Sequence, residues 1–356
     1  MIFMSLEQQI KDKALALGFD AAGITDAAPI SPEHVAHLEA WLRSGYAGRM
    51  DYMHRHLEKR IDPARLLDGA RSVIVVALNY KPRESMADGG SGHCERSAAI
   101  RMADSSRGDS PLGRVAQYAQ YEDYHPFIKS RLRALADVLR LRTDGAHRFR
   151  LCVDSAPLAE KALAVRAGLG FIGRNHLLIH PRLGPQILLG EIVTTAALRP
   201  DEPVGGSCGQ CNRCLQACPT GALRPDGFLD ARRCTSYLTQ YGAPEEWNDG
   251  IMEYWSNGGT PPHHSTVPPF QYPNPLRGWL FGCDECLLAC PYQRNAPPCA
   301  NSRFRWYHER AALNPRAVLA WTPEEFEARF HDSPLRRLGL ENLQHNARLC
   351  RADRVP

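Results

Sequence analysis

Eight of the twelve cysteines fall into a pattern of two proline-terminated runs, and this spacing constrains the chain more than any other feature. The first run has three cysteines at intervals of three residues and a fourth directly before Pro219. The second run ends before Pro291 and has one further cysteine far upstream of it. The eight are Cys208, Cys211, Cys214, Cys218, Cys234, Cys283, Cys286 and Cys290. Such spacing is typical of two [4Fe–4S] clusters, because a loop that turns every three residues directs successive thiolates at one cluster.

The cysteine before each proline is expected to bind the neighbouring cluster rather than its own. The first cluster would then be held by Cys208, Cys211, Cys214 and Cys290. The second would be held by Cys218, Cys234, Cys283 and Cys286.

Zinc and disulfides are the alternatives for these cysteines. Zinc needs one closed set of four ligands and requires neither the third cysteine nor the proline. Disulfides suit small secreted chains, whereas this one starts with Met1 to Met4 and a polar helical segment rather than a signal peptide. The pattern therefore favours iron–sulfur clusters. The other cysteines are interpreted as buried or incidental thiols: Cys94, Cys152, Cys299 and Cys350.

The composition is that of an ordinary globular protein. With 356 residues, 44% of them hydrophobic and 23% charged, the chain can bury a large core and divide into two or three lobes. No apolar run approaches the roughly 20 residues of a membrane helix, so we expect a cytoplasmic protein whose thiols stay reduced. The formal charge of +4 does not by itself indicate a nucleic-acid partner.

The first two hundred residues alternate helical and strand patterns. Ser5 and Gln8 form a capping-box signature before an amphipathic helix that Gly18 ends. Further helices are predicted over Ser31–Gly45, Pro126–Leu139 and Pro157–Ala167. Strands are predicted over Phe149–Val153, over Ile187–Thr195, and over the continuous apolar run Ser72–Tyr80, which is typical of a strand buried on both faces. The alternation predicts an α/β layer structure.

Two polar segments interrupt this pattern. The stretch from Pro82 to Pro111 is rich in glycine and serine and is interpreted as a loop or lid. A second loop is predicted from Ala243 to Pro275, and its His263 and His264 are expected to be solvent-exposed rather than metal ligands. From Asn301 onward the pattern is helical, with a clear helix start at Thr322.

The segment from Gly168 to Gly173 matches the G-x-G-x-x-G pattern of dinucleotide sites. Such a site needs a strand before the glycines and a helix after them. The order here is the reverse, because Ala159 to Ala167 is helical in pattern and Leu177 to Ile179 is extended. We therefore predict a tight helix-to-strand turn and no NAD site.

Asp154 ends the apolar strand pattern and precedes Ser155, Ala156 and Pro157. Open α/β sheets present their reactive groups at the carboxyl ends of strands, which favours a proton donor whose pKa is raised by partial burial. An aspartate before a helix-starting proline is also a common helix cap. The residues alone leave both interpretations open.

Several segments, in order along nearly the whole chain, resemble the epoxyqueuosine reductase family. They are Arg60–Pro63, Leu66–Leu67, Ala70–Ser72, Leu78–Tyr80, Asp123–His125, Val153–Pro157, Gly168–Asn175, Gly190–Ile192 and both cysteine runs. The resemblance implies an α/β cobalamin-binding catalytic domain over residues 1–200. It also implies a ferredoxin-like domain with two [4Fe–4S] clusters over 201–300, and a C-terminal helical segment packing on the core over 301–356.

The resemblance further implies the reduction of epoxyqueuosine to queuosine at the wobble position of tRNA, with Asp154 as the proton donor. Val153, Leu158 and the corrin face would give this carboxyl an apolar surround. Because the chain lacks a D-x-H-x-x-G segment, cobalamin is expected to bind base-off, without a protein ligand to cobalt. Residues nominated to line the corrin are Arg60, Asp154, Gly173, Arg174, Asn175, Ser236 and Asp284.

The expected partners are a tRNA anticodon loop and an unidentified electron donor such as a flavodoxin or ferredoxin system, with the enzyme a monomer. Phosphate contacts are expected among Arg232, Arg233, Arg303, Arg305, Arg336 and Arg337. Two other classes of protein remain open at this point. A reductive dehalogenase shares the cofactors but normally carries an export signal. A ferredoxin-type electron carrier would explain the cysteines but would leave the first two hundred residues without a role.

Overall fold

The computed structural model describes residues 4–83, 112–242 and 276–352, and it divides into two compact units. The first unit comprises Met1–Lys81, Asp123–Asn212 and Leu287–Phe304. The second comprises Pro82–Glu122, Arg213–Cys286 and Arg305–Pro356. Each unit combines segments that lie far apart in the sequence.

A four-stranded sheet in the order β1-β2-β7-β4 forms the centre of the first unit. The strands are β1 (Ala21–Asp26), β2 (Ser72–Asn79), β4 (Phe149–Cys152) and β7 (Ile187–Thr194). All three neighbouring pairs are antiparallel. The mixed α/β content is as predicted, but the argument from the shared edge of an open α/β sheet is wrong for this sheet, because antiparallel neighbours end at opposite edges.

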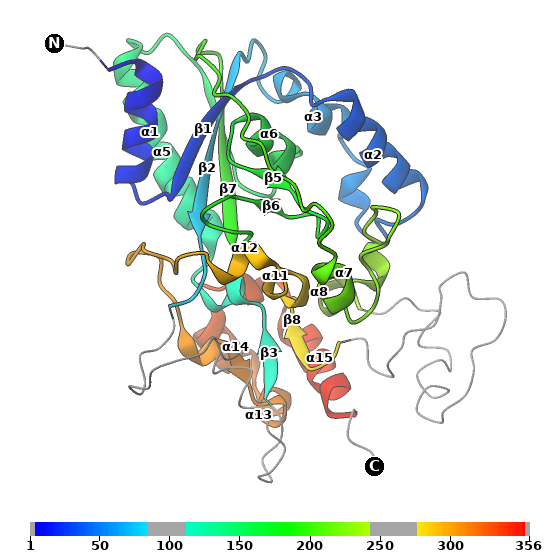
Figure 1. Ribbon diagram of the computed structural model, residues 1–356. Coiled ribbons are helices and arrows are strands. Elements are labelled where there is room, and N and C mark those ends of the chain that lie inside the picture. The colour runs from blue at the N-terminus through cyan, green and yellow to red at the C-terminus, as the bar shows by residue number, and fades with distance from the viewer. Residues whose placement is uncertain (1–3, 84–111, 243–275, 353–356) are drawn as a thin grey trace. The chain divides into compact units, whose positions relative to one another are not determined.

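The sheet is covered by helices on both faces. Figure 1 shows α1 (Leu6–Ala16) and α5 (Tyr124–Arg142) on one side and α6 (Glu160–Arg166) on the other. All eight residues of β2 are buried, as its continuous apolar run predicts. Gly190 on β7 faces α5 closely, because a Cβ there would lie 2.6 Å from a methyl carbon of Ile128. The residue after it therefore points to the opposite face, toward α6.

The predicted first and second helices are confirmed. The Ser5 Oγ accepts a hydrogen bond from the backbone N–H of Gln8 at 3.2 Å and caps α1, which ends before Gly18 with its φ of 95°. The second helix, α2 (Pro32–Arg43), is capped by Ser31 and is followed by Gly45 in a left-handed conformation.

The elements around Asp154 lie close to their predicted ranges. The helix expected from Pro126 to Leu139 extends further at both ends, as α5, because Asp123 caps it before Tyr124. The strands expected at Phe149 and Ile187 are β4 and β7. The helix expected from Pro157 begins only at Glu160, because Leu158 N–H bonds to Ala156 in a turn instead.

The glycine-rich segment forms a turn from α6 into the two-stranded sheet of β5 (Phe171–Ile172) and β6 (Leu178–Ile179), as predicted. Gly170 has a φ of 148°, and a Cβ there would lie 2.1 Å from the Ile179 carbonyl oxygen. The glycine is thus required for close approach of the chain to itself.

The second unit contains a three-stranded sheet in the order β8-β3-β9, formed by Trp279–Phe281, Gly113–Val115 and Ala312–Leu313. Helix α15 (Leu340–Ala352) packs on β8 and on α13 (Pro315–Ala320). The predicted helix start at Thr322 is confirmed by a complete capping box at the start of α14 (Pro323–Phe330).

The other described elements are short. The α-helices are α3 (Leu57–Ile61), α7 (Arg213–Ala217), α8 (Thr235–Tyr241), α11 (Glu285–Leu288) and α12 (Pro291–Arg294). The 3-10 helices are Asp51–Met53, Pro63–Arg65, Gln117–Gln120, Ala231–Arg233, His308–Arg310 and Pro334–Arg337.

Some predictions fall outside the described residues. They are the predicted loop from Ala243 to Pro275, all of the predicted loop from Pro82 to Pro111 except its first two residues, and Cys94, His263 and His264. The domain division at residues 200 and 300 stays a prediction. None of the helices in the described ranges has the length and apolar character to cross a bilayer.

Candidate active site and cluster ligands

Asp154 occupies a strained turn directly after β4. Its φ is 55°, and the Ser155 N–H donates to the Val153 carbonyl at 2.5 Å, so Asp154 is the central residue of a three-residue turn. Strain of this kind persists where surrounding contacts hold it, and it is common at functional sites. The helix-cap interpretation is wrong, because Ala159 stands at the N-cap of α6 and Asp154 lies five residues before it.

The Asp154 carboxylate faces the first turn of α5. Its Oδ2 accepts a hydrogen bond from the Tyr124 hydroxyl at 2.8 Å and lies 3.2 Å from Nε2 of His125. The other ring nitrogen of His125, Nδ1, lies 2.8 Å from Oδ1 of Asp123. A histidine between two carboxylates can hold a proton and pass it on.

The protein alone does not bury the Asp154 carboxyl. Its side chain is 57% exposed, although Val153 and Leu158 beside it are buried. Val153 and Leu158 therefore provide only part of the apolar surround expected for this carboxyl. The carboxylate itself is accessible to a substrate.

The backbone of Asp154 is held from behind by a glutamate. Oε1 of Glu160 accepts the Asp154 backbone N–H at 2.7 Å. The Glu160 carboxyl lies close to that of Glu191, which is 0% exposed on β7 and whose oxygens have no hydrogen-bond donor. Sequence reasoning selected none of Tyr124, His125, Glu160 and Glu191 as site residues. Only the segments Asp123–His125 and Gly190–Ile192 gave a signal, as parts of the family resemblance.

Two of the nominated corrin residues have buried polar atoms that lack partners. Nε of Arg60 and Nδ2 of Asn175 are both buried without a hydrogen bond. Buried donors without partners are rare in folded proteins and indicate a missing group. Arg60 also lies close enough to Glu160 for the two charges to interact, which places it near the Asp154 turn.

The other nominated residues have roles within the chain itself. A Cβ on Gly173 would lie 2.4 Å from Cδ1 of Ile179, so packing explains this glycine. The Arg174 N–H donates to Cys208 Sγ at 3.4 Å. The N–H of Ser236 donates to the Cys234 thiol, and Asp284 is buried with its carboxylate bound to the Gln117 N–H at 2.7 Å. Burial raises the pKa of Asp284 to about 6.

The four predicted ligands of the second cluster all belong to the second unit: Cys218, Cys234, Cys283 and Cys286. Burial raises the pKa of the Cys286 thiol, and the nearby thiols of Cys234 and Cys218 raise it further. A backbone N–H donates to the sulfur of Cys234 and another to that of Cys283. Half-buried sulfurs that would repel one another as anions have the chemistry of cluster ligands, and metal binding would release their protons.

The predicted ligands of the first cluster divide between the units. Cys208, Cys211 and Cys290 belong to the first unit, in which Cys208 packs with Cys290, Phe171 and Ile179. The backbone N–H groups of Tyr292 and Gln293 lie near Cys290 Sγ and favour its thiolate form. Cys214, which is buried on α7, belongs to the second unit.

All eleven cysteines that the structure describes are free thiols, so the disulfide alternative fails for them. Cys152, Cys299 and Cys350 are buried, as expected for structural thiols.

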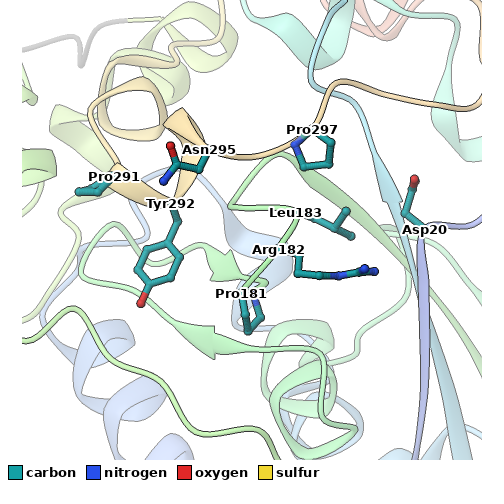
Figure 2. Close-up of a pocket in the computed structure, with 8 residues that line it drawn as sticks. All are labelled: Asp20, Pro181, Arg182, Leu183, Pro291, Tyr292, Asn295 and Pro297. Carbon is teal, nitrogen blue, oxygen red and sulfur yellow. The ribbon is translucent and has the colours of Figure 1, made fainter.

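A cavity of about 720 Å³ lies in the first unit and shares no lining residue with the Asp154 turn. In Figure 2 the side chains of Tyr292 and Asp20 lie on opposite sides of the labelled group, with Arg182 between them. Its wall includes Pro291 and Tyr292, which follow Cys290 in the chain. No sequence pattern indicated this cavity.

An accessible carboxyl at a strained turn of an α/β unit, together with two sets of cysteines spaced for cubane clusters, indicates an iron–sulfur oxidoreductase. The family model described as "Epoxyqueuosine reductase QueG, DUF1730" matches residues 60–155, and the model "4Fe-4S double cluster binding domain" matches residues 207–257. The chain belongs to the epoxyqueuosine reductase family.

The relatives support this membership over most of their length. The epoxyqueuosine reductase of Pseudomonas aeruginosa is 37% identical over 343 residues, which cover 96% of this chain and 83% of the relative. The Escherichia coli enzyme is 34% identical over 338 residues, which cover 94% and 77%. The predicted activity is confirmed, and the dehalogenase and electron-carrier alternatives are wrong.

Solved structures of epoxyqueuosine reductases agree with this family membership. An epoxyqueuosine reductase with a tRNA-Tyr epoxyqueuosine-modified stem loop is 28% identical, covers 97% of this chain and 80% of its own, and has a TM-score of 0.77. A Bacillus subtilis epoxyqueuosine reductase, solved with the catalytic loop of its aspartate swung out of the active site, is 27% identical with the same coverage and TM-score.

Proposed function

We propose that this chain reduces epoxyqueuosine to queuosine at the wobble position of tRNA, with Asp154 as the proton donor and with two [4Fe–4S] clusters and base-off cobalamin as cofactors. The observation that carries the proposal is the strained Asp154 turn, whose accessible carboxylate is held by Tyr124 and His125. Converting an epoxide to an alkene consumes two electrons and two protons and releases one water molecule. The side chains have to supply only the protons.

Asp154 has the geometry of a general acid that can be reloaded. Its carboxyl would protonate the epoxide oxygen as the carbon–oxygen bond breaks, and would then be an anion. His125 lies within hydrogen-bond distance of this carboxyl and is oriented by Asp123, so it can return a proton to Asp154. The Tyr124 hydroxyl would stabilise the anion in the meantime. The oxygen would leave as water after it takes up the second proton.

We assign the first cluster to Cys208, Cys211, Cys214 and Cys290 and the second to Cys218, Cys234, Cys283 and Cys286. When bound, the clusters supply electrons one at a time at low potential. Backbone N–H groups that donate to Cys208, Cys234, Cys283 and Cys290 would favour the charged, reduced form of each cluster. An external donor such as a flavodoxin or ferredoxin would deliver the electrons to a monomeric enzyme in the cytoplasm.

The residues proposed to hold cobalamin include Arg60 and Asn175, whose unpartnered Nε and Nδ2 atoms are suited to amide and phosphate oxygens. Gly173, Arg174, Ser236 and Asp284 complete the proposed set. When bound, cobalamin supplies a reduced cobalt that can attack or reduce a strained carbon–oxygen bond. Its corrin would also cover the Asp154 carboxyl, which the chain leaves 57% exposed.

The tRNA substrate is supported by the relative solved with a modified stem loop. The modified base would have to leave the anticodon stack to reach Asp154. Three of the arginines expected to contact phosphates are less available for RNA binding than predicted. Arg232, Arg305 and Arg336 already form ion pairs with carboxylates, and an RNA contact would have to break these pairs.

The test is anaerobic turnover of tRNA that carries epoxyqueuosine, with Asp154→Asn compared with Asp144→Asn. Asp144 is the matched control, because it is also an aspartate with positive φ, at 49°, but lies in an exposed loop. Asp154→Asn should keep its iron and lose at least about 100-fold in kcat, while Asp144→Asn stays at the wild-type rate. Equal activity of both variants would remove Asp154 from the mechanism. Equal turnover of the free nucleoside and the tRNA would remove the RNA substrate.

A further inference from the structure

The carboxyl group of Glu191 is buried in the core of the first unit without an N–H or O–H donor. The residue is 0% exposed on β7, and its neighbours on the same face, Leu189 and Val193, belong to the apolar cluster between the sheet and α6. Neither of its oxygens receives a hydrogen bond from such a donor. A lone carboxylate in this position would carry a large desolvation penalty, so it must hold or share a proton.

The carboxyl group within reach of Glu191 is that of Glu160. Burial raises the pKa of Glu191 well above its ordinary value, and the charge of Glu160 adds to the effect. Burial also raises the pKa of Glu160 to about 7, with a further contribution from Asp154. Two facing carboxyl groups, one of which has no N–H or O–H donor of its own, retain one proton between them, because both cannot ionise at low cost.

The remaining oxygen interactions of Glu160 are directed at the Asp154 turn. Its Oε1 accepts the Asp154 N–H at 2.7 Å, and this N–H belongs to the residue whose φ is 55°. A turn of this kind relaxes unless a contact holds it. The hydrogen bond to Glu160 fixes the direction in which the Asp154 side chain leaves the backbone.

The charged and titratable groups around the pair come from four elements. Arg60 faces Glu160 from α3, and its positive charge reduces the cost of ionisation. Lys161, the next residue on α6, acts in the same direction. Asp154 opposes ionisation from the turn, and the buried thiol of Cys152 lies beside Glu191 on the paired strand β4.

We propose that Glu160 and Glu191 form a proton-sharing carboxyl pair that positions the Asp154 turn for catalysis and releases it when the shared proton is lost. With the proton in place, Glu191 anchors Glu160, and Glu160 anchors Asp154. Without it, the two carboxylates repel each other inside the core and Glu160 turns away. Both glutamates act through Asp154 and are positioning residues. The effect on turnover rests on the proposed function, whereas the shared proton does not.

The shared proton is tested first, in the cofactor-containing protein and without a turnover assay. Infrared difference spectra between pH 6 and pH 9 should show the loss of a protonated-carboxyl C=O band in the wild type. In Glu191→Gln, whose amide N–H replaces the shared proton, this band should weaken to the contribution of Asp284, whose pKa is raised to about 6. Glu33→Gln removes an exposed glutamate from α2 and should keep the band. A band of equal intensity in Glu191→Gln and in the wild type would overturn the proposal.

The positioning role is tested by the kcat of two variants at Glu160. Glu160→Gln keeps a side-chain oxygen for the Asp154 N–H, whereas Glu160→Ala removes it. The loss of kcat should be at least about tenfold smaller in the glutamine variant, with equal iron content in both and little change in KM. The ratio of Glu191→Gln to wild-type activity should also rise between pH 7 and pH 9. Equal losses in the two Glu160 variants, or a flat ratio, would refute the positioning role.

The proposed function and the proton-sharing carboxyl pair can be refuted independently of each other. An inactive wild type that still shows the infrared band would overturn the proposed function and leave the carboxyl pair standing. An active wild type whose Asp154→Asn variant is inactive, but which lacks the band of the carboxyl pair, would overturn the carboxyl pair and leave the proposed function standing.

Discussion

The buried carboxyl pair makes the stability of this protein fall as the pH rises toward neutrality. Burial raises the pKa of Glu160 from an ordinary value of 4.5 to about 7. Between these values the folded protein binds a proton that the unfolded chain has released. The stabilisation is therefore complete below about pH 4.5 and is lost as the pH rises through about 7. This is the opposite of the behaviour of an ion-paired carboxylate.

The size of the effect follows from the rise in pKa. Each pKa unit corresponds to about 1.4 kcal/mol, so the rise at Glu160 corresponds to about 3 kcal/mol of the free energy of unfolding. The pKa of Glu191 is raised as well, which makes this figure a lower bound. Such a loss is a large fraction of the roughly 5–15 kcal/mol that stabilises a typical domain.

The assay is anaerobic urea unfolding at a series of pH values from 5 to 8, with the wild type compared with the double variant Glu160→Gln, Glu191→Gln. Other titrating groups change both proteins alike, so the difference between them isolates the pair. The wild type should lose about 3 kcal/mol or more relative to the double variant over this range. The control Glu33→Gln should follow the wild type. Parallel curves for wild type and double variant would show that the pair does not hold an additional proton.

Three further outcomes are expected. Cys234→Ser should lose about four of the roughly eight iron atoms that two clusters contain, as measured by anaerobic iron and sulfide quantitation, and full loading would remove Cys234 from the ligand set. Tyr124→Phe should lower kcat about tenfold and leave KM unchanged, because its hydroxyl stabilises the Asp154 anion; a change in KM alone would assign Tyr124 to substrate binding. Gly170→Ala should destabilise the fold by roughly 2 kcal/mol or more in urea unfolding, since its Cβ would lie 2.1 Å from the Ile179 carbonyl oxygen; an unchanged midpoint would show that this turn can relax.

Local features of the fold could be predicted because short-range physics determines them. Ser5, Ser31 and Thr322 cap helices in the structure as their sequence context indicates, since a capping hydroxyl needs only its own neighbours. The run from Ser72 to Asn79 is buried on both faces, as its composition indicates. The antiparallel pairing of the strands could not be predicted, because the pairing of β2 with β7 depends on contacts between residues more than a hundred positions apart.

The sequence by itself determined the cluster ligands' spacing, the family, and the position of Asp154 after a strand. Those properties reside in residues that are neighbours in the chain. Only the tertiary structure decided the surroundings of Asp154. His125 approaches it from α5 and Glu160 from α6, and Glu191 lies behind them on β7. In the sequence Glu191 is one acid in an apolar strand, and it becomes a titrating partner only because the sheet and α6 together exclude water from it.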